Sequence, residues 1–337
     1  MRKQIRQAAL AGLCVIAVAL MGAAPAAAPA PTNPLVPVPN KVTKNYQILV
    51  TPKAVGVPFW ETVHLGASVA AKRFGVTIVW KGTTAETDIA GQTAIIEDYI
   101  NRHVDGMVMA ATSAKGMASL VTKALKAGIK VVTVDSGVIP NTSLSYLATN
   151  NVKGGMLLAD AIAAQIHDRG KVALIDIVPG AASGDQRRDG FKMEITKYPK
   201  IKIVYEQYDT ADSAKGLALA EDALTSHADL AGFAVEDGPG AVGVGQALIA
   251  KHVAGKVKFV TFDFSSALNA YLLKGVAQGL VIQNPFAMGY LGVQSVIDAI
   301  QGKKLQKQID TGITLVTKAN YNTPAVQRLL FPQKYYH

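Results

Sequence analysis

Short apolar segments alternate with amphipathic segments along the chain from residue 46 onward. The first, residues 46–51 (YQILVT), is a continuous apolar run typical of a buried parallel strand. Residues 60–74 follow with apolar side chains at helical spacing, and Gly75 predicts the end of that helix. The alternation then predicts a strand at 76–80, a helix at 88–101, a strand at 106–110, a helix at 114–127 and a strand at 130–134.

The same pattern restarts after residue 150. It predicts helices at 153–166, 186–197, 213–226, 241–252, 266–273 and 287–300, and strands at 171–176, 202–206, 231–235, 257–262, 279–283 and 313–316. Repeated strand–helix units with right-handed crossovers form parallel sheets that helices cover on both faces. Because there are too many strands for one open sheet of this kind, we predict an α/β fold of two doubly wound lobes. A closed eight-stranded barrel is the alternative.

The first forty residues differ from the rest of the chain and indicate export. Three basic residues precede an apolar run at 8–24, and small residues follow it. We therefore predict a cleavable signal peptide at 1–28 and a proline-rich spacer at 29–43. A membrane anchor is the alternative, since the run approaches the ~17–20 residues that span a bilayer. The only cysteine, Cys14, lies in the predicted signal peptide, so the exported chain has no thiol and no disulfide.

Composition and charge exclude several classes of protein. The chain is 50% hydrophobic, 17% charged and 7% aromatic, which excludes general disorder and favours an α/β protein. Its formal net charge is +10, but lysine and arginine occur in ones and twos. A nucleic-acid footprint needs clustered basic residues, so we expect no nucleic-acid partner. The six histidines are scattered without paired spacing, so we expect no metal site.

Polar side chains gather in the loops that follow the predicted strands. Ligands of open α/β sheets bind beyond the carboxyl ends of the strands, so these loops predict a ligand site. Any one of these residues could instead cap a helix, but their presence in both halves of the chain weakens that interpretation. They are Lys53, Asp135, Ser136, Asp185, Arg187, Glu236, Asp237, Asp263, Gln283 and Asn284.

Two other kinds of chemistry have some support in the sequence. Residues 238–243 contain the G-x-G-x-x-G pattern of a dinucleotide site. The two carboxylates that precede it would repel a pyrophosphate, so we interpret the glycines as sites of close packing between strand and helix and expect no cofactor. Asp135 and Asp263 could form the acid–base pair of an exported glycosidase, and the residues alone leave that alternative open. The chain contains no nucleophile elbow, zinc-protease motif or P-loop.

Taken together, residues 44–320 resemble the periplasmic substrate-binding proteins of ABC importers, in the ribose/galactose class (type I periplasmic binding proteins). The motifs that carry the resemblance are LVTPKAVGVPFW at 49–60, VVTVDS at 131–136, ATNNVKGG at 148–155, DQRRDGF at 185–191, FVTFD at 259–263 and GLVIQNP at 279–285. The PKAVGVPFW segment is most similar to the subgroup of rhamnose-binding and autoinducer-2-binding proteins. That subgroup often has lysine where Lys53 stands, and its autoinducer-2 type has a pair that matches Asp185-Gln186.

The resemblance implies two doubly wound lobes, joined by a three-strand hinge, that close on a ligand. It places the N-terminal lobe at 44–149 and 284–310. The C-terminal lobe and tail are then 150–283 and 311–337.

The resemblance also implies roles for individual residues. Phe59 and Trp60 match the aromatic pair that flanks a sugar ring, and Asp135 matches a carboxylate that accepts two ligand hydroxyls. The family arginine, second-lobe aspartate and hinge glutamine correspond to Arg187, Asp263 and Gln283. There are departures from the ribose pattern: Ser136, Ala211 and Glu236 stand where the ribose type has arginine, an aromatic residue and asparagine.

The predicted site contains two cations, Lys53 and Arg187, against four carboxylates, which favours a neutral sugar or polyol over a phosphate or a carboxylate. We therefore expect a monomeric, non-enzymatic periplasmic protein that delivers a sugar to an ABC permease. It would meet the membrane only through that permease. The alternatives are a sensory protein for an autoinducer-2-like signal and the exported glycosidase.

Overall fold

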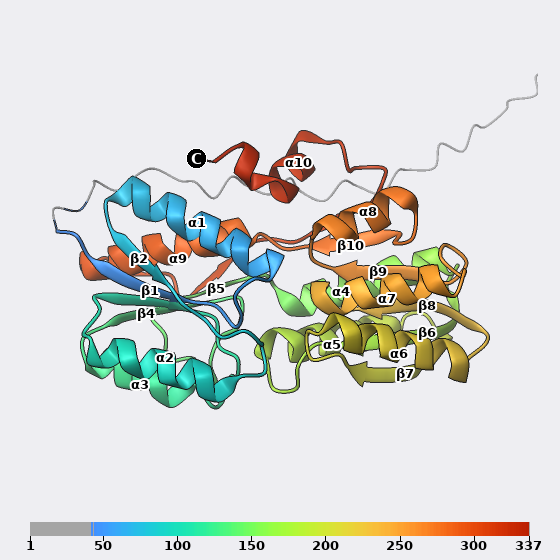
Figure 1. The fold of residues 1–337 in the computed structure, drawn as a ribbon, viewed down its shortest axis with the longest axis horizontal. Coiled ribbons are helices and arrows are strands. Elements are labelled where there is room, and N and C mark those ends of the chain that lie inside the picture. Colours follow the sequence, from blue (N-terminus) through green and yellow to red (C-terminus); the bar gives the residue numbers. More distant parts are fainter. Residues whose placement is uncertain (1–41, 43, 337) are drawn as a thin grey trace, which may run out of the picture. The chain divides into compact units, whose positions relative to one another are not determined.

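The computed structural model describes residue 42 and residues 44–336. The predicted signal peptide and nearly all of the predicted spacer lie outside these described residues. Within the described part of the chain, the strands form two open six-stranded sheets. The two sheets confirm the predicted fold of two doubly wound lobes, and the eight-stranded barrel is wrong. We call the lobe built on the first sheet the N-lobe and the other the C-lobe; they lie on the left and right of Figure 1.

The N-lobe sheet has the strand order β11-β5-β4-β3-β1-β2, with every pair parallel. Its strands are β1 (Gln47–Thr51), β2 (Thr77–Trp80), β3 (Gly106–Met109), β4 (Lys130–Val134), β5 (Tyr146–Ala148) and β11 (Gln308–Asp310). The C-lobe sheet has the order β12-β10-β9-β8-β6-β7, in which β12 alone is antiparallel to its neighbour. Its strands are β6 (Arg169–Asp176), β7 (Lys200–Tyr208), β8 (Leu230–Val235), β9 (Lys258–Phe262), β10 (Gly279–Ile282) and β12 (Thr314–Val316).

Helices cover both faces of each sheet. In the N-lobe, α1 (Pro58–Phe74) and α9 (Pro285–Ile300) pack together on one face, and α2 (Ile89–Asn101) and α3 (Ala118–Lys126) cover the other (Figure 1). In the C-lobe, α4 (Asn151–Gln165) and α5 (Ala182–Ile195) cover one face. The opposite face carries α6 (Ser213–Ser226), α7 (Gly238–Ala250) and α8 (Ser266–Lys274). The tail adds α10 (Pro324–Leu330) and the 3-10 turn η1 (Pro332–Lys334).

Local sequence explains why these elements begin and end where they do. Pro58 opens α1, where its missing N–H costs no hydrogen bond, and Gly75 ends the helix in the left-handed conformation at φ 77°. Central strands such as β3 and β10 are buried on both faces, as their unbroken apolar runs predict, whereas the edge strands β2, β7 and β11 are partly exposed. The four largest hydrophobic clusters among the described residues lie one on each face of each sheet. No helix in the described part of the chain is both long enough and apolar enough to span a membrane.

Both sheets repeat one strand order, and this order determines where a ligand can bind. The order β2-β1-β3-β4-β5 in the N-lobe matches β7-β6-β8-β9-β10 in the C-lobe. In the N-lobe, β2 lies on one side of β1 and β3 lies on the other, so the strand order changes direction between β1 and β3. In the C-lobe, it changes direction between β6 and β8 in the same way. Such switch points open a crevice at the carboxyl ends of the strands. The loops that follow β1 and β6 therefore lie at these crevices.

The chain passes between the two sheets three times. The passages lie between β5 and α4, between β10 and α9, and between β11 and β12. Asn150 and Asn284 stand at the first two, and each caps the helix that follows it, with hydrogen bonds of 3.0 Å. The Thr149 hydroxyl donates to the carbonyl of Gly312 at 3.2 Å, which ties the first passage to the third.

Some element limits differ from those predicted. Helix α5 begins at Ala182, four residues before the predicted start, because the small residues ahead of Gln186 look like a loop but form the first turn. Helix α3 begins at Ala118 rather than 114, after a non-helical turn. Strands β5 and β11 have three residues each and were too short to produce a periodic signal.

Candidate functional site

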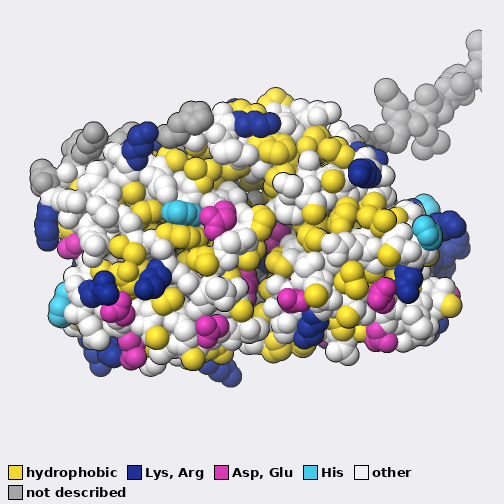
Figure 2. All heavy atoms as spheres, in the orientation of Figure 1, with side chains coloured by type: hydrophobic (Ala, Val, Ile, Leu, Met, Phe, Trp, Pro, Cys, Tyr) yellow, Lys and Arg dark blue, Asp and Glu magenta, His cyan; other side chains and the backbone are white. Residues whose placement is uncertain are grey.

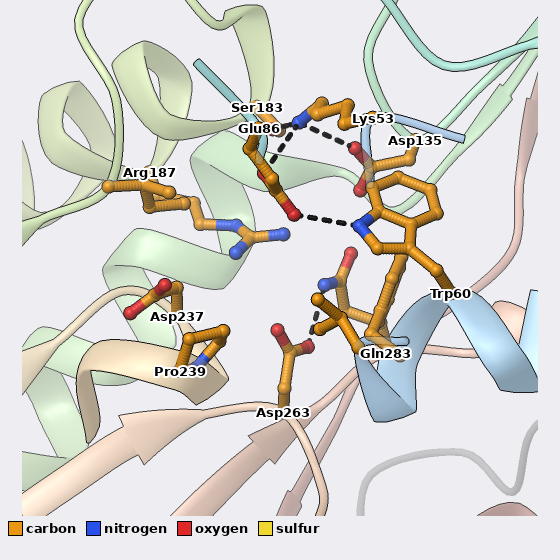
Figure 3. A pocket seen from close by; sticks show the side chains of 13 residues that line it. Lys53, Trp60, Glu86, Asp135, Ser183, Arg187, Asp237, Pro239, Asp263 and Gln283 are labelled. Atoms are coloured by element: carbon orange, nitrogen blue, oxygen red, sulfur yellow. Dashed lines mark hydrogen bonds and ion pairs between the residues drawn. The ribbon is translucent and has the colours of Figure 1, made fainter. Parts of the chain in front are cut away.

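Loops from both lobes surround a cavity of about 330 Å³, part of which is open to solvent. Figure 2 shows a furrow between the two halves, with acidic side chains in and beside it, and Figure 3 shows the cavity from nearby. The N-lobe contributes Lys53, Val57, Phe59, Trp60, Glu86 and Asp135 to its lining; the C-lobe and the β10–α9 passage contribute Ile177, Ser183, Arg187, Asp237, Pro239, Asp263 and Gln283.

Lys53 lies at the centre of the N-lobe side of the cavity. Its Nζ atom lies 3.0 Å from Asp135 Oδ2 and 3.9 Å from Glu86 Oε2. It also donates a hydrogen bond of 3.1 Å to the hydroxyl of Ser183, which belongs to the C-lobe. The side chain is only 3% exposed, and such a buried charge needs these partners. The ammonium group thus holds both N-lobe carboxylates in place (Figure 3).

Arg187 is the corresponding cation of the C-lobe. Its Nε donates to Asn151 Oδ1 at 2.9 Å and one terminal nitrogen donates to the carbonyl of Glu236 at 2.6 Å. The guanidinium carbon lies 4.1 Å from the centre of the Phe262 ring, a cation–π contact. These contacts fix the plane of the guanidinium group at the cavity wall. A fixed guanidinium can donate two parallel hydrogen bonds to ring oxygens or hydroxyls of a ligand.

Asp263 and Gln283 form a hydrogen-bonded pair on the cavity wall. Gln283 donates to Asp263 at 2.8 Å, and its own amide oxygen is buried without a hydrogen-bond partner in the protein. Burial raises the pKa of Asp263 to about 6, although Arg187 and the bond from Gln283 oppose the shift. The pair offers one carboxyl and one free amide oxygen to a hydroxylated ligand.

Phe59 and Trp60 line the cavity, but the structure does not show them as opposite walls of it. Their ring centres are 4.8 Å apart and the rings meet edge to face at 88°. Rings at that separation are in direct contact, so no sugar ring fits between them. Both rings therefore form one apolar wall of the cavity, and their contact with a sugar ring stays a prediction. The Trp60 indole nitrogen donates to Glu86 at 2.7 Å, which fixes the orientation of the ring.

Three residues predicted for the site lie outside the cavity lining. Asp185 is in the first turn of α5, where its carboxylate pairs with Arg188 at 3.4 Å and its side chain is 38% exposed. The side chain of Ser136 is fully buried and contacts Ser183 instead of the cavity. Glu236 is fully buried behind Arg187, and its carboxylate oxygens have no hydrogen-bond partner in the protein. The early start of α5 explains why Asp185 lies outside the cavity. Asp185 belongs to the first turn of the helix, on its exposed side, and not to a loop that faces the cavity.

Two polar residues that the prediction did not include line the cavity, together with Asp237, which the sequence placed in a strand-end loop but to which it gave no role in binding. Glu86 is in the loop after β2, Ser183 is in the first turn of α5, and Asp237 follows β8 and caps α7. Glu86 follows the carboxyl end of β2, where ligands of open α/β sheets bind, so the same reasoning applied to β2 could have found it. The cavity still contains two cations and four carboxyl groups, because Glu86 and Asp237 take the places predicted for Asp185 and Glu236.

Buried carboxyl groups extend from the cavity into the C-lobe. Burial, assisted by nearby carboxylates, raises the pKa of Asp176 and of Asp209 to about 7 each. Burial also raises the pKa of Glu236 and Asp237 well above the usual range. These groups lie at the carboxyl ends of β6, β7 and β8, where a parallel sheet brings strand-end residues together. Their raised pKa values favour the protonated form of these carboxyl groups, which can donate as well as accept hydrogen bonds.

The glycine pattern at 238–243 has a packing role. A Cβ at Gly243 would meet the Ser213 carbonyl at 1.9 Å, and the carbonyl of Gly240 lies 2.3 Å from a Cβ position on Gly216. The glycines therefore let α7 approach α6, whereas we had predicted an approach between helix and strand. Asp237 occupies the N-terminus of α7, where a pyrophosphate would have to bind. Among the described residues, no cluster of three or more side chains is arranged to hold a metal ion.

Two doubly wound lobes with a cavity between their strand ends, linked by three chain passages, define a two-lobed ligand-binding protein. A family model described as "Periplasmic binding protein domain" matches residues 48–304, and the chain belongs to that family.

Individual relatives agree with this assignment. The ribose import binding protein of Bacillus subtilis is 29% identical over 276 residues, which cover 82% of this chain and 88% of that protein. The D-allose-binding periplasmic protein of Escherichia coli is 28% identical, with 75% of this chain and 84% of that protein covered. A carbohydrate transporter solute-binding protein from Agrobacterium radiobacter, solved in complex with D-arabinose, superposes with a TM-score of 0.83. It is 33% identical, and the match covers 86% of this chain and all of that one.

Proposed function

We propose that this protein is an extracytoplasmic solute-binding protein that captures one neutral monosaccharide between its lobes and delivers it to an ABC import permease. The observation that carries the proposal is the lining of the cavity. Two cations that are already engaged by protein groups face four carboxyl groups and an unpartnered amide oxygen. Such a surface suits hydroxyl groups, which donate to carboxylates and accept from guanidinium, and it repels anionic ligands. The sugar-bound relatives support the same class of ligand.

The apolar wall supports a sugar over a more polar solute. Phe59 and Trp60 present ring edges and faces that can cover the C–H surface of a sugar ring, while the polar groups face its hydroxyls. The relatives are named for ribose, allose and arabinose, so a pentose or a hexose is the ligand we favour.

The resemblance to the rhamnose and autoinducer-2 subgroup concerns mainly the segment that contains Lys53. Autoinducer-2 would require the pair matching Asp185-Gln186 to face the ligand, but Asp185 lies outside the cavity and pairs with Arg188. We therefore favour a sugar over that signal and retain rhamnose as a member of the panel below.

We further propose binding without turnover by a monomer in the periplasm. Asp135, one member of the glycosidase pair, is held by Lys53, and Asp263 is bonded to Gln283. Both carboxyl groups are thus placed to hold hydroxyls. The named functions of the relatives are binding and import.

The test is a thermal-shift screen of neutral pentoses, hexoses, rhamnose and autoinducer-2, followed by mass spectrometry of the recovered ligand. A ligand at a hundred times its Kd adds about 2.7 kcal/mol of stability, so a true ligand raises the melting temperature clearly. We expect one or a few neutral sugars to do so and to be recovered unchanged. A chemically altered sugar would support the glycosidase, and a response to autoinducer-2 alone would support the sensory protein.

A further inference from the structure

Two serines meet directly between the lobes. Ser136 follows Asp135 at the end of β4 in the N-lobe, and Ser183 is in the first turn of α5 in the C-lobe. Their hydroxyl oxygens are 2.8 Å apart, and the residues are 0% and 1% exposed. The contact is therefore a buried hydrogen bond between lobes that no ligand mediates.

The same contact supplies a helix cap that α5 lacks in its own sequence. Four other C-lobe helices, α4, α6, α7 and α8, each donate a backbone N–H of their first turn to the side chain of the residue that precedes the helix. In α5 that position is Ala181, which has no capping group. The Ser183 backbone N–H instead donates to the Ser136 hydroxyl at 3.4 Å. One of the free N–H groups at the start of α5 is thus satisfied by the other lobe.

Further contacts between the lobes surround this pair. Lys53 donates to the Ser183 hydroxyl at 3.1 Å, a charge-assisted bond (Figure 3). Near it, the backbone N–H of Ala114 donates to the carbonyl of Gly180 at 3.2 Å. The loops after β3 and β4 therefore contact the start of α5 through side chains and backbone together.

We propose that Ser136 and Ser183 form a latch that stabilises the closed arrangement of the lobes, and that both serines act on ligand affinity by positioning the lobes. Opening the cleft would separate the hydroxyls and leave the start of α5 without its cap. Because a ligand binds tightly only to the closed state, its apparent affinity falls with the closed fraction. The loss of one latch hydroxyl should therefore weaken binding about two- to tenfold without changing the order of preference among sugars.

The effect of the latch on sugar affinity rests on the proposed function, whereas its effect on lobe closure does not. The first experiment therefore uses small-angle X-ray scattering on the ligand-free protein. We expect Ser136→Ala and Ser183→Ala to have a larger radius of gyration than the unchanged protein. Ser143→Ala is the matched control, because its hydroxyl is also buried but bonds only to Thr133, Asn141 and Ser145 of the N-lobe. Radii that equal that of the unchanged protein in both latch variants would overturn the proposal.

A cross-link tests the same contact without removing a hydroxyl. In a chain with Cys14→Ser, the variant Ser136→Cys/Ser183→Cys has no other cysteine. Side chains whose hydroxyls are 2.8 Å apart are close enough for a disulfide. We expect oxidation of the ligand-free variant to form the bond, to reduce the radius of gyration and to be reversed by dithiothreitol. Two thiols that stay free under oxidation would contradict a latch.

Measurements of sugar binding distinguish a failure of the proposed function from a failure of the latch. If no sugar binds but the latch variants expand, the proposed function fails and the latch stands. If a sugar binds, we expect it to dissociate faster from both latch variants than from Ser143→Ala. Unchanged dissociation rates in Ser136→Ala and Ser183→Ala would overturn the latch and leave the sugar-binding function intact.

Discussion

Asp135 and Asp263 occupy equivalent positions in the two lobes. Each is the first residue after the fourth strand of its doubly wound unit, β4 or β9. Each has left-handed backbone geometry, with φ of 57° and 68°. Each also donates its backbone N–H to the fifth strand at 3.0 Å, to Leu147 and Val281 respectively. Such geometry is uncommon for residues other than glycine and is maintained here at both walls of one cavity.

This relationship predicts that each aspartate can be neutralised without disturbing its loop. Asparagine tolerates the left-handed conformation, so both loops should keep their backbone geometry. Asp135→Asn also removes the nearest carboxylate of the buried Lys53, so it should lower stability more than Asp263→Asn does. A hydrogen bond to a charged group contributes about 1.5–3 kcal/mol, so each change should weaken sugar binding about tenfold or more. Isothermal titration calorimetry with the sugar found in the thermal-shift screen measures both variants. Full affinity in both would show that these carboxyl groups do not contact the ligand.

The fixed plane of Arg187 predicts a strict requirement for its guanidinium group. Lysine cannot reproduce the bonds to Asn151 and Glu236 together with the stacking on Phe262, so Arg187→Lys should bind almost as weakly as Arg187→Ala. We expect a loss of about tenfold or more by calorimetry.

The control for Arg187 is Asp185→Ala. Asp185 belongs to the same helix and was predicted for the site, but it lies outside the cavity. Its removal should leave affinity unchanged. A strong loss of sugar affinity in Asp185→Ala would show that Asp185 contributes to the site. Full sugar affinity in Arg187→Lys would show that the fixed guanidinium plane is not required.

Trp60 should act both through its ring and through its bond to Glu86. Trp60→Phe keeps an aromatic wall but removes the donor that holds Glu86 at 2.7 Å, so we expect a moderate loss of affinity. Trp60→Ala removes the wall as well, and the loss of a large buried ring should also lower stability by about 3–5 kcal/mol. Calorimetry and urea unfolding together separate these effects. Equal affinity in Trp60→Phe and Trp60→Ala would show that the ring itself contributes nothing.

The buried carboxyl groups predict that stability falls as pH rises through neutrality. The pKa values of Asp176 and Asp209 are raised to about 7 and that of Asp263 to about 6, above the values of an unfolded chain. Between about pH 4 and 7 the folded protein therefore binds more protons than the unfolded one. The free energy of unfolding should then be at least about 1 kcal/mol higher at pH 5 than at pH 8, as urea titrations would measure.

One carboxyl group can be removed to test the source of that slope. Asp176→Asn mimics the protonated form, so its stability should change less between pH 5 and 8 than that of the unchanged protein. Asp229→Asn is the control, since Lys171 lowers the pKa of Asp229 and moves its titration below this window. A slope that survives in Asp176→Asn and disappears in Asp229→Asn would contradict this assignment.

The alternation of apolar runs predicted the two-lobed fold because parallel strands are buried on both faces and each helix buries one side. It also placed Lys53, Asp135, Arg187, Asp263 and Gln283 at strand ends, and the structure brings all five to one cavity. The sequence could not show which side of α5 faces the cavity, since that depends on a helix start hidden among small residues. It also could not show that Ser136 meets Ser183, because a contact between lobes depends on how they pack.

The most direct test of the central claim is a calorimetric comparison of each neutral sugar with its own anionic derivative, such as the sugar phosphate or sugar acid. The account predicts that one neutral monosaccharide saturates the protein at one molecule per chain. Its anionic derivative should bind at least about tenfold more weakly, because the carboxyl groups that line the cavity outnumber its two cations and those cations already bind protein groups. An anionic derivative that binds more tightly than its neutral parent, or a complete absence of binding by neutral sugars, would contradict it.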